Sequence, residues 1–373
     1  MRLHAKSNER PEDRMTNSYR LARPRVAITM GDPCGVGPEI IAKALSSREI
    51  HEHCQPVVIG EMKALERAAR QIGVASTVHC IEALESIEGL SNPGSICVLN
   101  PSSLSLKDIA YGQPSPVACK AVTQYIEEAV RLALARQVDA ICTCPIHKAN
   151  LQKHGFSFPG HTEFLQELTQ AKEVVMMLVG PRLRVSLVTI HHPLADVPGI
   201  LTEESIYRTI AITGEALLND FGLEYARIGV AGLNPHAGEQ GHFGTEERDL
   251  IQPAVRGFRK GPYRVEGPFP PDTLFHRAYE GEFDAVIAMY HDQGLIPIKL
   301  VHFHEAVNVT LGLPILRTSV DHGTAYDIAG TGKAHHGSLD AALRLATVMA
   351  RNRRERIPQL APDQESFTKS HEE

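Results

Sequence analysis

The sequence lacks any segment that could anchor the chain in a membrane or direct its export. No window of about 18 uninterrupted apolar residues occurs among the 373 residues, and the first 24 residues contain no apolar core of a signal peptide. An excess of positive charge is also missing, because the formal net charge is -6, which argues against a nucleic-acid partner. These absences predict a protein that is neither secreted nor membrane-spanning and that binds no nucleic acid.

Cysteine is too sparse and too unevenly placed for a disulfide framework. The seven cysteines are odd in number and all precede Pro145, which favours a reducing, cytoplasmic location. Cys142, Cys144 and His147 form a C-x-C-x-x-H group. The strand expected there ends at Pro145, so we favour sulfurs that fill a buried layer over a thiolate metal site.

Short apolar runs alternate with helical patterns from Arg25 onwards, which is typical of a largely parallel α/β sheet. A long helix is expected around residues 122–134, and a second begins at Leu339 behind Ser338 as a possible cap. The expected strands are Val26 to Met30, Pro56 to Ile59, Ile96 to Leu99, Ala140 to Cys144, Val174 to Leu178, Arg184 to Ile190, Ile228 to Leu233 and Ala285 to Met289.

The two ends of the chain differ from the rest. Residues 1–24 are polar and aperiodic, which predicts a disordered N-terminal extension, with Met15 as an alternative start. Residues 358–373 predict a polar tail. No linker divides residues 25–357, so we expect a single catalytic unit.

Polar residues gather directly after the apolar run Ala285 to Met289. The run leads into "YHDQG", whose glycine, Gly294, would permit a sharp turn. Lys299, Asn308 and Arg317 then follow at intervals of nine residues, and such side chains bind anions by charge and hydrogen bonding. The stretch predicts a site for a phosphorylated or carboxylated small molecule.

Two glycine-rich segments are candidates for ligand loops. Gly31 to Glu39 follows the first strand and opens a helix, yet it matches neither GxGxxG nor GK[ST], and a merely tight turn is as good an interpretation. Val320 to Lys333 combines glycine with hydrogen-bonding groups and has no period, which favours a cofactor loop. No Gly-x-Ser-x-Gly elbow occurs, so a serine hydrolase is not expected.

Histidine accounts for 19 of the 373 residues, and several lie beside glycine or proline at expected strand ends. These are His161 in "PGHTEF", His191 in "VTIHHPL", His236 in "GLNPHAGE" and His291 in "MYHDQG". Neutral imidazoles that converge at one sheet edge would suit Zn²⁺ or Co²⁺ with one position open for substrate. Their wide separation matches no zinc finger, so hydrogen-bonded structural histidines are the alternative.

With these segments assembled, the chain resembles the 4-hydroxythreonine-4-phosphate dehydrogenase family of pyridoxal 5'-phosphate biosynthesis. The resemblance implies an α/β fold like that of isocitrate and isopropylmalate dehydrogenases, with two α/β/α lobes and the active site in the cleft between them. The lobes would comprise roughly 25–135 plus 305–357, and 136–304, in a homodimer with the active site at the subunit interface. The motifs run in order over residues 25–350: "ITMGDPCGVGPEI", "CPIHKANL", "PGHTEF", "VVMMLV", "GLNPHAGE", "GTEE", "PDTLF", "AMYHDQGL", "NVTLGLP" and "RTSVDHGTAYDIAGTGKA".

The resemblance also implies roles for individual residues. The substrate contacts fall on His161, Thr162, Lys299, Asn308 and Arg317. The metal ligands fall on His191, His236 and His291. The expected cofactor contacts are His322, Gly323 and Asp327.

Two positions near the expected metal ligands, His192 and Asp292, each leave two interpretations open. The family's usual "TTHLPL" reads "TIHHPL" here, so His192 competes with His191, and alignment places the ligand at His191. Asp292 follows His291, and this pair is expected to be catalytic, with Asp292 handling a proton or supporting the metal ligand.

The implied reaction is oxidation of 4-phosphohydroxy-L-threonine to 2-amino-3-oxo-4-phosphooxybutanoate, which decarboxylates to 3-amino-2-oxopropyl phosphate. The implied cofactors are NAD or NADP and one divalent metal per subunit, Zn, Mg or Co, acting as a Lewis acid. One alternative is a dehydrogenase of threonate or erythronate 4-phosphate. Others are a metal-dependent phosphohydrolase or lyase and a non-catalytic binding module, and the loop from His322 to Lys333 argues against both.

Overall fold

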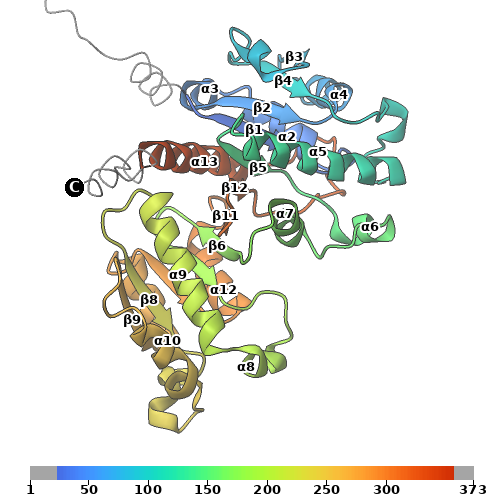
Figure 1. The fold of residues 1–373 in the computed structure, drawn as a ribbon. Helices are drawn as coiled ribbons and strands as arrows, with labels where there is room; N and C mark the ends of the chain where they lie inside the picture. Colours follow the sequence, from blue (N-terminus) through green and yellow to red (C-terminus); the bar gives the residue numbers. More distant parts are fainter. Residues whose placement is uncertain (1–22, 357–373) are drawn as a thin grey trace, which may run out of the picture.

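One twelve-stranded sheet runs through the computed structural model, which describes residues 23–356 (Figure 1). The order across the sheet is β3-β4-β2-β1-β5-β12-β11-β6-β7-β10-β8-β9. Every strand expected from the apolar runs is present, and four more join them. The strands are β1 (Arg25–Thr29), β2 (Gln55–Ile59), β3 (Thr77–Cys80), β4 (Ser95–Leu99), β5 (Ala140–Thr143), β6 (Val175–Val179), β7 (Arg184–Leu187), β8 (Arg227–Ala231), β9 (Arg264–Phe269), β10 (Ala285–Ala288), β11 (Val307–Leu311) and β12 (Leu316–Ser319).

The sheet is largely parallel, as expected, but it reverses direction near its middle. Strand β11 pairs antiparallel with both β12 and β6, and β6 pairs antiparallel with β7. Outside this group, neighbours such as β5 and β12, or β7 and β10, are parallel. The two halves of the sheet therefore meet at β11.

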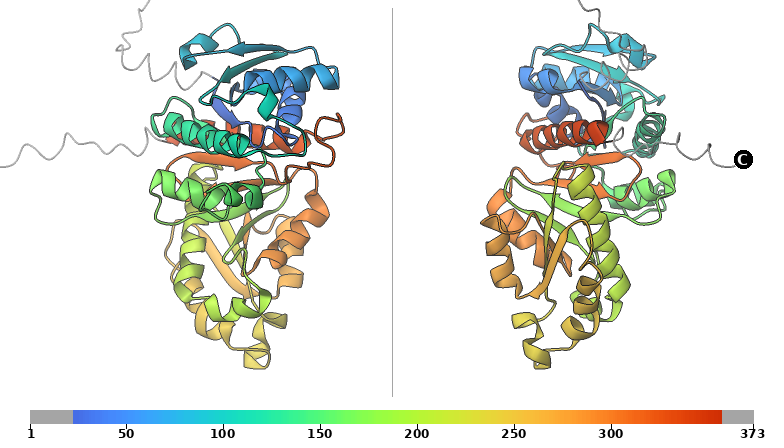
Figure 2. Two further views of the ribbon diagram at one scale, coloured as in Figure 1. Left: turned by 90° about the vertical axis from the view of Figure 1, so that its right-hand side faces the viewer. Right: turned by 60° about the vertical axis from the view of Figure 1, so that its left-hand side comes forward.

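Helices cover both faces of the sheet. In the first half, α5 and α13 pack on opposite sides of β5, and in the second, α9 and α12 pack on opposite sides of β7 and β10 (Figure 2). The α-helices are α2 (Gly37–Ala44), α3 (Arg48–His53), α4 (Met62–Ile72), α5 (Pro116–Leu134), α6 (Lys148–Lys153), α7 (His161–Thr169), α8 (Val197–Ile200), α9 (Glu203–Asn219), α10 (Gln252–Arg256), α11 (Pro271–Tyr279), α12 (His291–His302) and α13 (Gly337–Arg356). Shorter helical turns are η1 (Leu84–Ile87), η2 (Leu106–Asp108), η3 (Leu194–Asp196), η4 (Pro235–Gly241) and η5 (Glu247–Ile251). Between residues 23 and 356, no helix combines the length and the apolar character needed to cross a membrane.

The lobe boundaries at 135/136 and 304/305 stay a prediction. Strand β5 lies between β1 and β12, so it belongs to the first half of the sheet. The expected extension and tail fall almost wholly on residues 1–22 and 357–373, which lie outside the described residues. Of the remainder, the carbonyl oxygen of Pro24 accepts a hydrogen bond from Gln55 N at the start of β2.

Two local predictions were wrong. Gly294 does not form a turn, because it lies inside α12, where an added Cβ would come within 2.6 Å of the Leu187 side chain on β7. This glycine lets the helix pack closely on the sheet. Ser338 does not precede α13 but lies within it, and its Oγ accepts a hydrogen bond from Asp321 N at 3.1 Å. The buried Cys142 and Cys144, in contrast, fill the core as expected.

Candidate active site

A pocket opens over the middle of the sheet, where its two halves meet. Because side chains alternate along a strand, Thr143 of β5, Arg317 and Ser319 of β12 and Asn308 of β11 share the face that forms its floor. The start of α7 and the loop after β7 supply the walls. We call this space the substrate pocket; its remaining lining residues are Cys144, Pro145, Ile146, Lys148, Gly160, His161, Thr162, Glu163, Met176, Ile190, His191, Val320, Asp321, His322 and Gly323.

Arg317 lies at the bottom of this pocket and is 3% exposed. Its guanidinium donates to Thr143 Oγ1 at 2.8 and 3.2 Å and to Thr310 Oγ1 at 2.9 Å. Among residues 23–356 no carboxylate forms an ion pair with it, and burial lowers the pKa of Arg317 to about 10. Its direct hydrogen-bond partners are neutral hydroxyls, and the Glu163 carboxylate attracts it only without an ion-pair contact. A buried cation with so little compensation is costly, so this position favours an anionic ligand.

Two further polar atoms in the pocket are buried and have no hydrogen-bond partner. They are His161 Nε2, at the first residue of α7, and Asn308 Oδ1, on β11. Burial, together with the charges of Arg317 and Lys148, holds the pKa of His161 well below its ordinary value. A neutral imidazole and an amide next to a guanidinium form a set that is complete only when a polar ligand is bound.

The three expected metal ligands follow three neighbouring parallel strands, β7, β10 and β8. The rings of His191 and His291 lie 5.9 Å apart between centroids. His236 lies in η4, where its backbone is left-handed (φ 53°) and its ring faces Phe243. Within residues 23–356 of this one chain, no three His, Cys, Asp or Glu side chains are grouped so that they could hold a metal ion. The residues present therefore supply two neighbouring imidazoles but no complete metal site.

The other residues near these histidines differ in their surroundings. His291 Nδ1 lies 2.7 Å from Asp292 Oδ1, so the expected pair is in contact, although neither residue lines the substrate pocket. His191 and His192 are both exposed, but only His191 lines the pocket. Their catalytic and metal-binding roles stay predictions.

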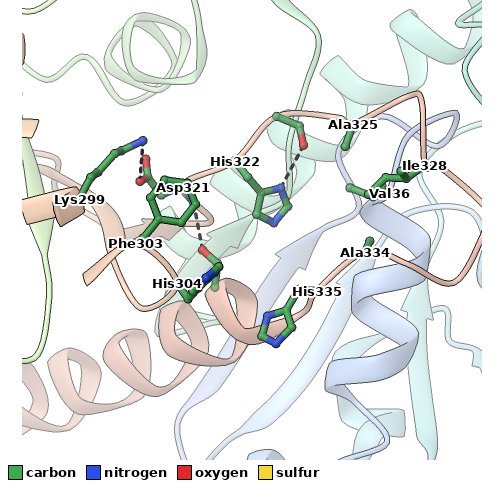
Figure 3. Close-up of a pocket in the computed structure, with 12 residues that line it drawn as sticks. Val36, Lys299, Phe303, His304, Asp321, His322, Ala325, Ile328, Ala334 and His335 are labelled. Carbon is green, nitrogen blue, oxygen red and sulfur yellow. Dashed lines mark hydrogen bonds and ion pairs between the residues drawn. The ribbon is translucent and has the colours of Figure 1, made fainter. Parts of the chain in front are cut away.

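A second pocket, which we call the cofactor pocket, adjoins the first (Figure 3). Asp321, His322 and Gly323 line both, so this segment is a shared wall. Of the expected cofactor contacts, His322 and Gly323 line this pocket, while Asp327 is exposed and lines neither; their role in cofactor binding stays a prediction. Its remaining lining residues are Val36, Lys299, Phe303, His304, Ala325, Ile328, Ala334, His335 and Ser338.

Lys299 does not join the other expected substrate contacts. Its Nζ forms a 3.1 Å ion pair with Asp321 Oδ2 and lines the cofactor pocket rather than the substrate pocket. Sequence reasoning in turn missed Lys148 and Glu163, which line the substrate pocket. Both stood inside quoted motifs, "CPIHKANL" and "PGHTEF", so their neighbours could have indicated them.

The fold and the two pockets define a class: a two-lobed α/β protein of the isocitrate and isopropylmalate dehydrogenase type, with an arginine-floored pocket where the halves of its sheet meet. Residues 52–346 match the family model described as pyridoxal phosphate biosynthetic protein PdxA. A 4-hydroxythreonine-4-phosphate dehydrogenase of Desulfosudis oleivorans is 50% identical over 87% of this chain and 95% of its own length. A D-threonate 4-phosphate dehydrogenase of Cupriavidus necator is 46% identical over 88% of this chain and 98% of its own.

Solved structures agree with this assignment. The crystal structure of 4-hydroxythreonine-4-phosphate dehydrogenase from Klebsiella pneumoniae superposes with a TM-score of 0.80 at 40% identity and covers 88% of this chain and 99% of its own. The chain belongs to the pyridoxal phosphate biosynthetic protein PdxA family and is an oxidoreductase. The family and fold predicted from the sequence are thereby confirmed. Membership implies a nicotinamide cofactor and a divalent metal.

Proposed function

We propose that the chain oxidises 4-phosphohydroxy-L-threonine with NAD or NADP as hydride acceptor. The observation that carries this proposal is Arg317, a buried guanidinium without a carboxylate partner among the described residues, beside the unpartnered atoms of His161 and Asn308. A phosphate or carboxylate of the substrate would supply the missing acceptor, because guanidinium groups bind such oxyanions through paired hydrogen bonds.

The neighbouring cofactor pocket supports a dehydrogenase over a phosphohydrolase or lyase. Hydride transfer requires the carbon that is oxidised and the nicotinamide to lie in contact, and the shared wall at 321–323 sets two binding spaces side by side. The carbon that bears the 3-hydroxyl transfers a hydride to NAD(P)⁺, and the hydroxyl group releases its proton. The product is 2-amino-3-oxo-4-phosphooxybutanoate. This β-keto acid loses carbon dioxide and gains a proton to give 3-amino-2-oxopropyl phosphate.

Glu163 favours the amino acid over the sugar acids. Its carboxylate lines the substrate pocket, and within residues 23–356 it forms no ion pair with a cation. The ammonium group of 4-phosphohydroxy-L-threonine would complement that charge, whereas threonate and erythronate 4-phosphates carry a hydroxyl at the same position. The second candidate stays the sugar-acid phosphate dehydrogenase, because a D-threonate 4-phosphate dehydrogenase is nearly as similar to the chain.

We further propose a homodimer that completes the metal site with Zn, Mg or Co. Helix α12 exposes Ile296 (64% exposed) and Leu300 (83%), and Phe303 (68%), which follows the helix and also lines the cofactor pocket, is exposed too. The same helix begins at His291, so a second copy seated on it would lie near the incomplete histidine set. Apolar side chains spaced by four and three residues on one exposed helix are typical of a protein interface.

Steady-state kinetics test the proposal. Formation of NAD(P)H is measured with 4-phosphohydroxy-L-threonine and with threonate and erythronate 4-phosphates, with each nicotinamide and with Zn, Mg or Co added to metal-free protein. We expect the largest kcat/KM for the amino acid. A larger value for either sugar acid would assign the second candidate, and release of inorganic phosphate without NAD(P)H would refute both.

A further inference from the structure

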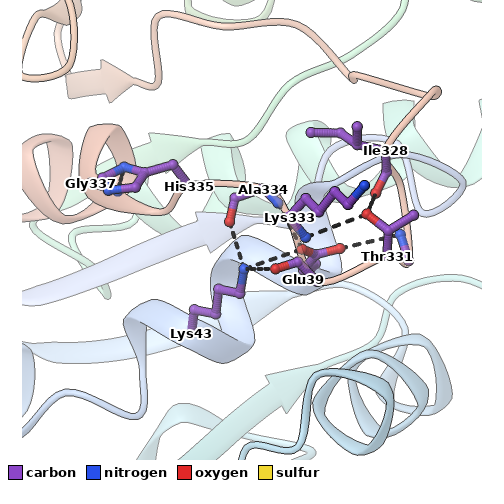
Figure 4. A network of polar contacts seen from close by, with 10 residues as sticks. Glu39, Lys43, Ile328, Thr331, Lys333, Ala334, His335 and Gly337 are labelled. Carbon is purple, nitrogen blue, oxygen red and sulfur yellow. Dashed lines mark hydrogen bonds and ion pairs between the residues drawn. The ribbon is translucent and has the colours of Figure 1, made fainter.

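Helix α2 carries a buried acid and a lysine one turn apart, Glu39 and Lys43, which are paired at 3.2 Å (Figure 4). The Glu39 side chain is 1% exposed and that of Lys43 18%. A buried carboxylate is retained only where several donors satisfy it, so the contacts of this pair indicate its role.

Those contacts reach residues 328–335, which lie about 290 residues further along the chain. These residues overlap the end of the loop expected from the sequence at 320–333, and from here on "cofactor loop" means residues 328–335. Glu39 accepts hydrogen bonds from the backbone nitrogens of Gly330 at 3.2 Å and Ala334 at 3.0 Å. Lys43 Nζ donates to the carbonyl oxygens of Gly332 at 2.8 Å and Ala334 at 2.6 Å. The pair therefore holds the loop by donors and acceptors together.

The cofactor loop forms no strand or helix, and Gly330 and Gly332 take left-handed conformations (φ 74° and 76°) that glycine adopts without strain. Apolar packing holds part of it, because Ala329 and Ala334 are buried in the hydrophobic core and Gly330 lies against the Tyr111 ring. Among the described residues, the hydrogen bonds that join the loop to parts of the protein beyond its own flanking residues run to the charged pair on α2.

The same loop builds one wall of the cofactor pocket. Ile328, Ala334 and His335 line it from the loop, and Val36 lines it from the residue before α2. The Glu39–Lys43 pair therefore sets the separation of two walls that belong to one binding space.

We propose that Glu39 and Lys43 are positioning residues for the nicotinamide dinucleotide. They act by holding the cofactor loop in place, without contacting the dinucleotide themselves. The assignment rests on the proposed function in so far as it takes the cofactor pocket to bind NAD(P). When the pair is broken, the loop samples other conformations. The apparent dissociation constant for NAD(P) equals the intrinsic constant divided by the fraction of protein whose loop is in the binding-competent conformation. If that fraction falls to one-tenth, the protein binds NAD(P) about tenfold more weakly.

The experiment compares NADH binding, followed by its own fluorescence or by calorimetry, in the wild-type protein, Lys43→Met, Glu39→Gln and Lys43→Arg. We expect Lys43→Met and Glu39→Gln to weaken NADH binding about tenfold or more while the KM for the phosphorylated substrate changes less than about twofold. Lys43→Arg keeps the cation and its donors and should recover most of the affinity. If Glu39→Gln does not fold, the partly exposed Lys43 decides the test.

Asp139→Asn is the matched control, because Asp139 belongs to another buried ion pair, with Arg354, that lines neither pocket. It should lower the unfolding temperature and leave NADH affinity unchanged. NADH affinity within about twofold of wild type in both Lys43→Met and Glu39→Gln, or an equal loss in Asp139→Asn, would overturn the assignment. A wild-type protein that forms NAD(P)H but tolerates these changes refutes only the positioning role, whereas a wild-type protein that binds no NADH refutes the proposed function as well.

Discussion

Replacing Arg317 by methionine tests whether this residue contributes to substrate affinity rather than to the stability of the fold. Burial lowers the pKa of Arg317 from its ordinary higher value to about 10, and a change of this size means that the folded chain holds the charge at a cost of about 3 kcal/mol. Both folded and unfolded chains keep the guanidinium protonated well below pH 10, so the cost is constant there and fades as the pH rises above about 10, where the folded chain loses the proton first.

Methionine relieves that cost but also removes hydrogen bonds to Thr143 and Thr310. These are worth about 1 kcal/mol each, so the free energy of unfolding should change by less than about 2 kcal/mol in either direction. Substrate binding has no such compensation. It loses a charge-assisted interaction of about 1.5 to 3 kcal/mol, which is about 10-fold to 150-fold in affinity, while NAD(P) affinity stays the same.

The assay combines urea unfolding of the free protein with the KM for phosphorylated substrate. A second readout is the rise in unfolding temperature caused by inorganic phosphate, which wild type should show and Arg317→Met should lose. Arg354→Met is the control: Arg354 is similarly buried but pairs with Asp139 at 2.6 Å, so its loss should cost about 3 to 5 kcal/mol of stability. The reasoning is wrong if Arg317→Met keeps the wild-type KM, or if it is destabilised as strongly as Arg354→Met.

Four further changes test the remaining assignments. Burial keeps the pKa of His161 well below its ordinary value, so stability should decline as the pH falls below about 6.5, where the unfolded chain gains a proton. His161→Gln should flatten that decline in urea titrations. His191→Ala should abolish turnover and metal retention, measured by elemental analysis, while His192→Ala keeps most of both; the reverse order would move the ligand by one residue. Glu163→Gln should lower kcat/KM for the amino acid more than for the sugar acids, and an equal loss would contradict the proposed contact. Leu300→Asp should convert the proposed dimer to a monomer in sedimentation experiments. A variant that stays dimeric would show that the exposed side of α12 is not the interface.

Sequence patterns located eight strands, which carry buried apolar runs, and missed four others, of which three have a clear physical reason. Strands β3 and β9 stand at the two edges of the sheet, so their side chains are largely accessible and show no apolar run. Strand β12 is fully buried but reads "LRTS", because Arg317 and Ser319 face the substrate pocket while Thr318 Oγ1 donates to Ala342 O of α13 on the other side. A buried polar strand cannot be distinguished from a loop by hydropathy alone.

The candidate site was predictable where motif and anion chemistry coincided. His161, Thr162, Asn308 and Arg317 were expected to bind substrate and do line one pocket. The ion pair of Lys299 with Asp321 and the hold of α2 on the cofactor loop depend on residues distant in sequence, and nothing local indicates such contacts.

The reversal of the sheet at β11 has a mechanical consequence. Strand β12 pairs with β11 through only two residue pairs, Asn308 with Ser319 and Val309 with Thr318, whereas β11 and β6 share five and β12 and β5 share four. If one lobe twisted against the other, this short join would bear much of the strain, together with the ion pair of Arg353 with Asp220 that also links the halves, and it would act as a hinge. Arg317 and Asn308 stand on opposite sides of that hinge, so a ligand bound to both acts as a brace across it. A ligand that binds one lobe angle more tightly than another would then couple substrate affinity to lobe angle.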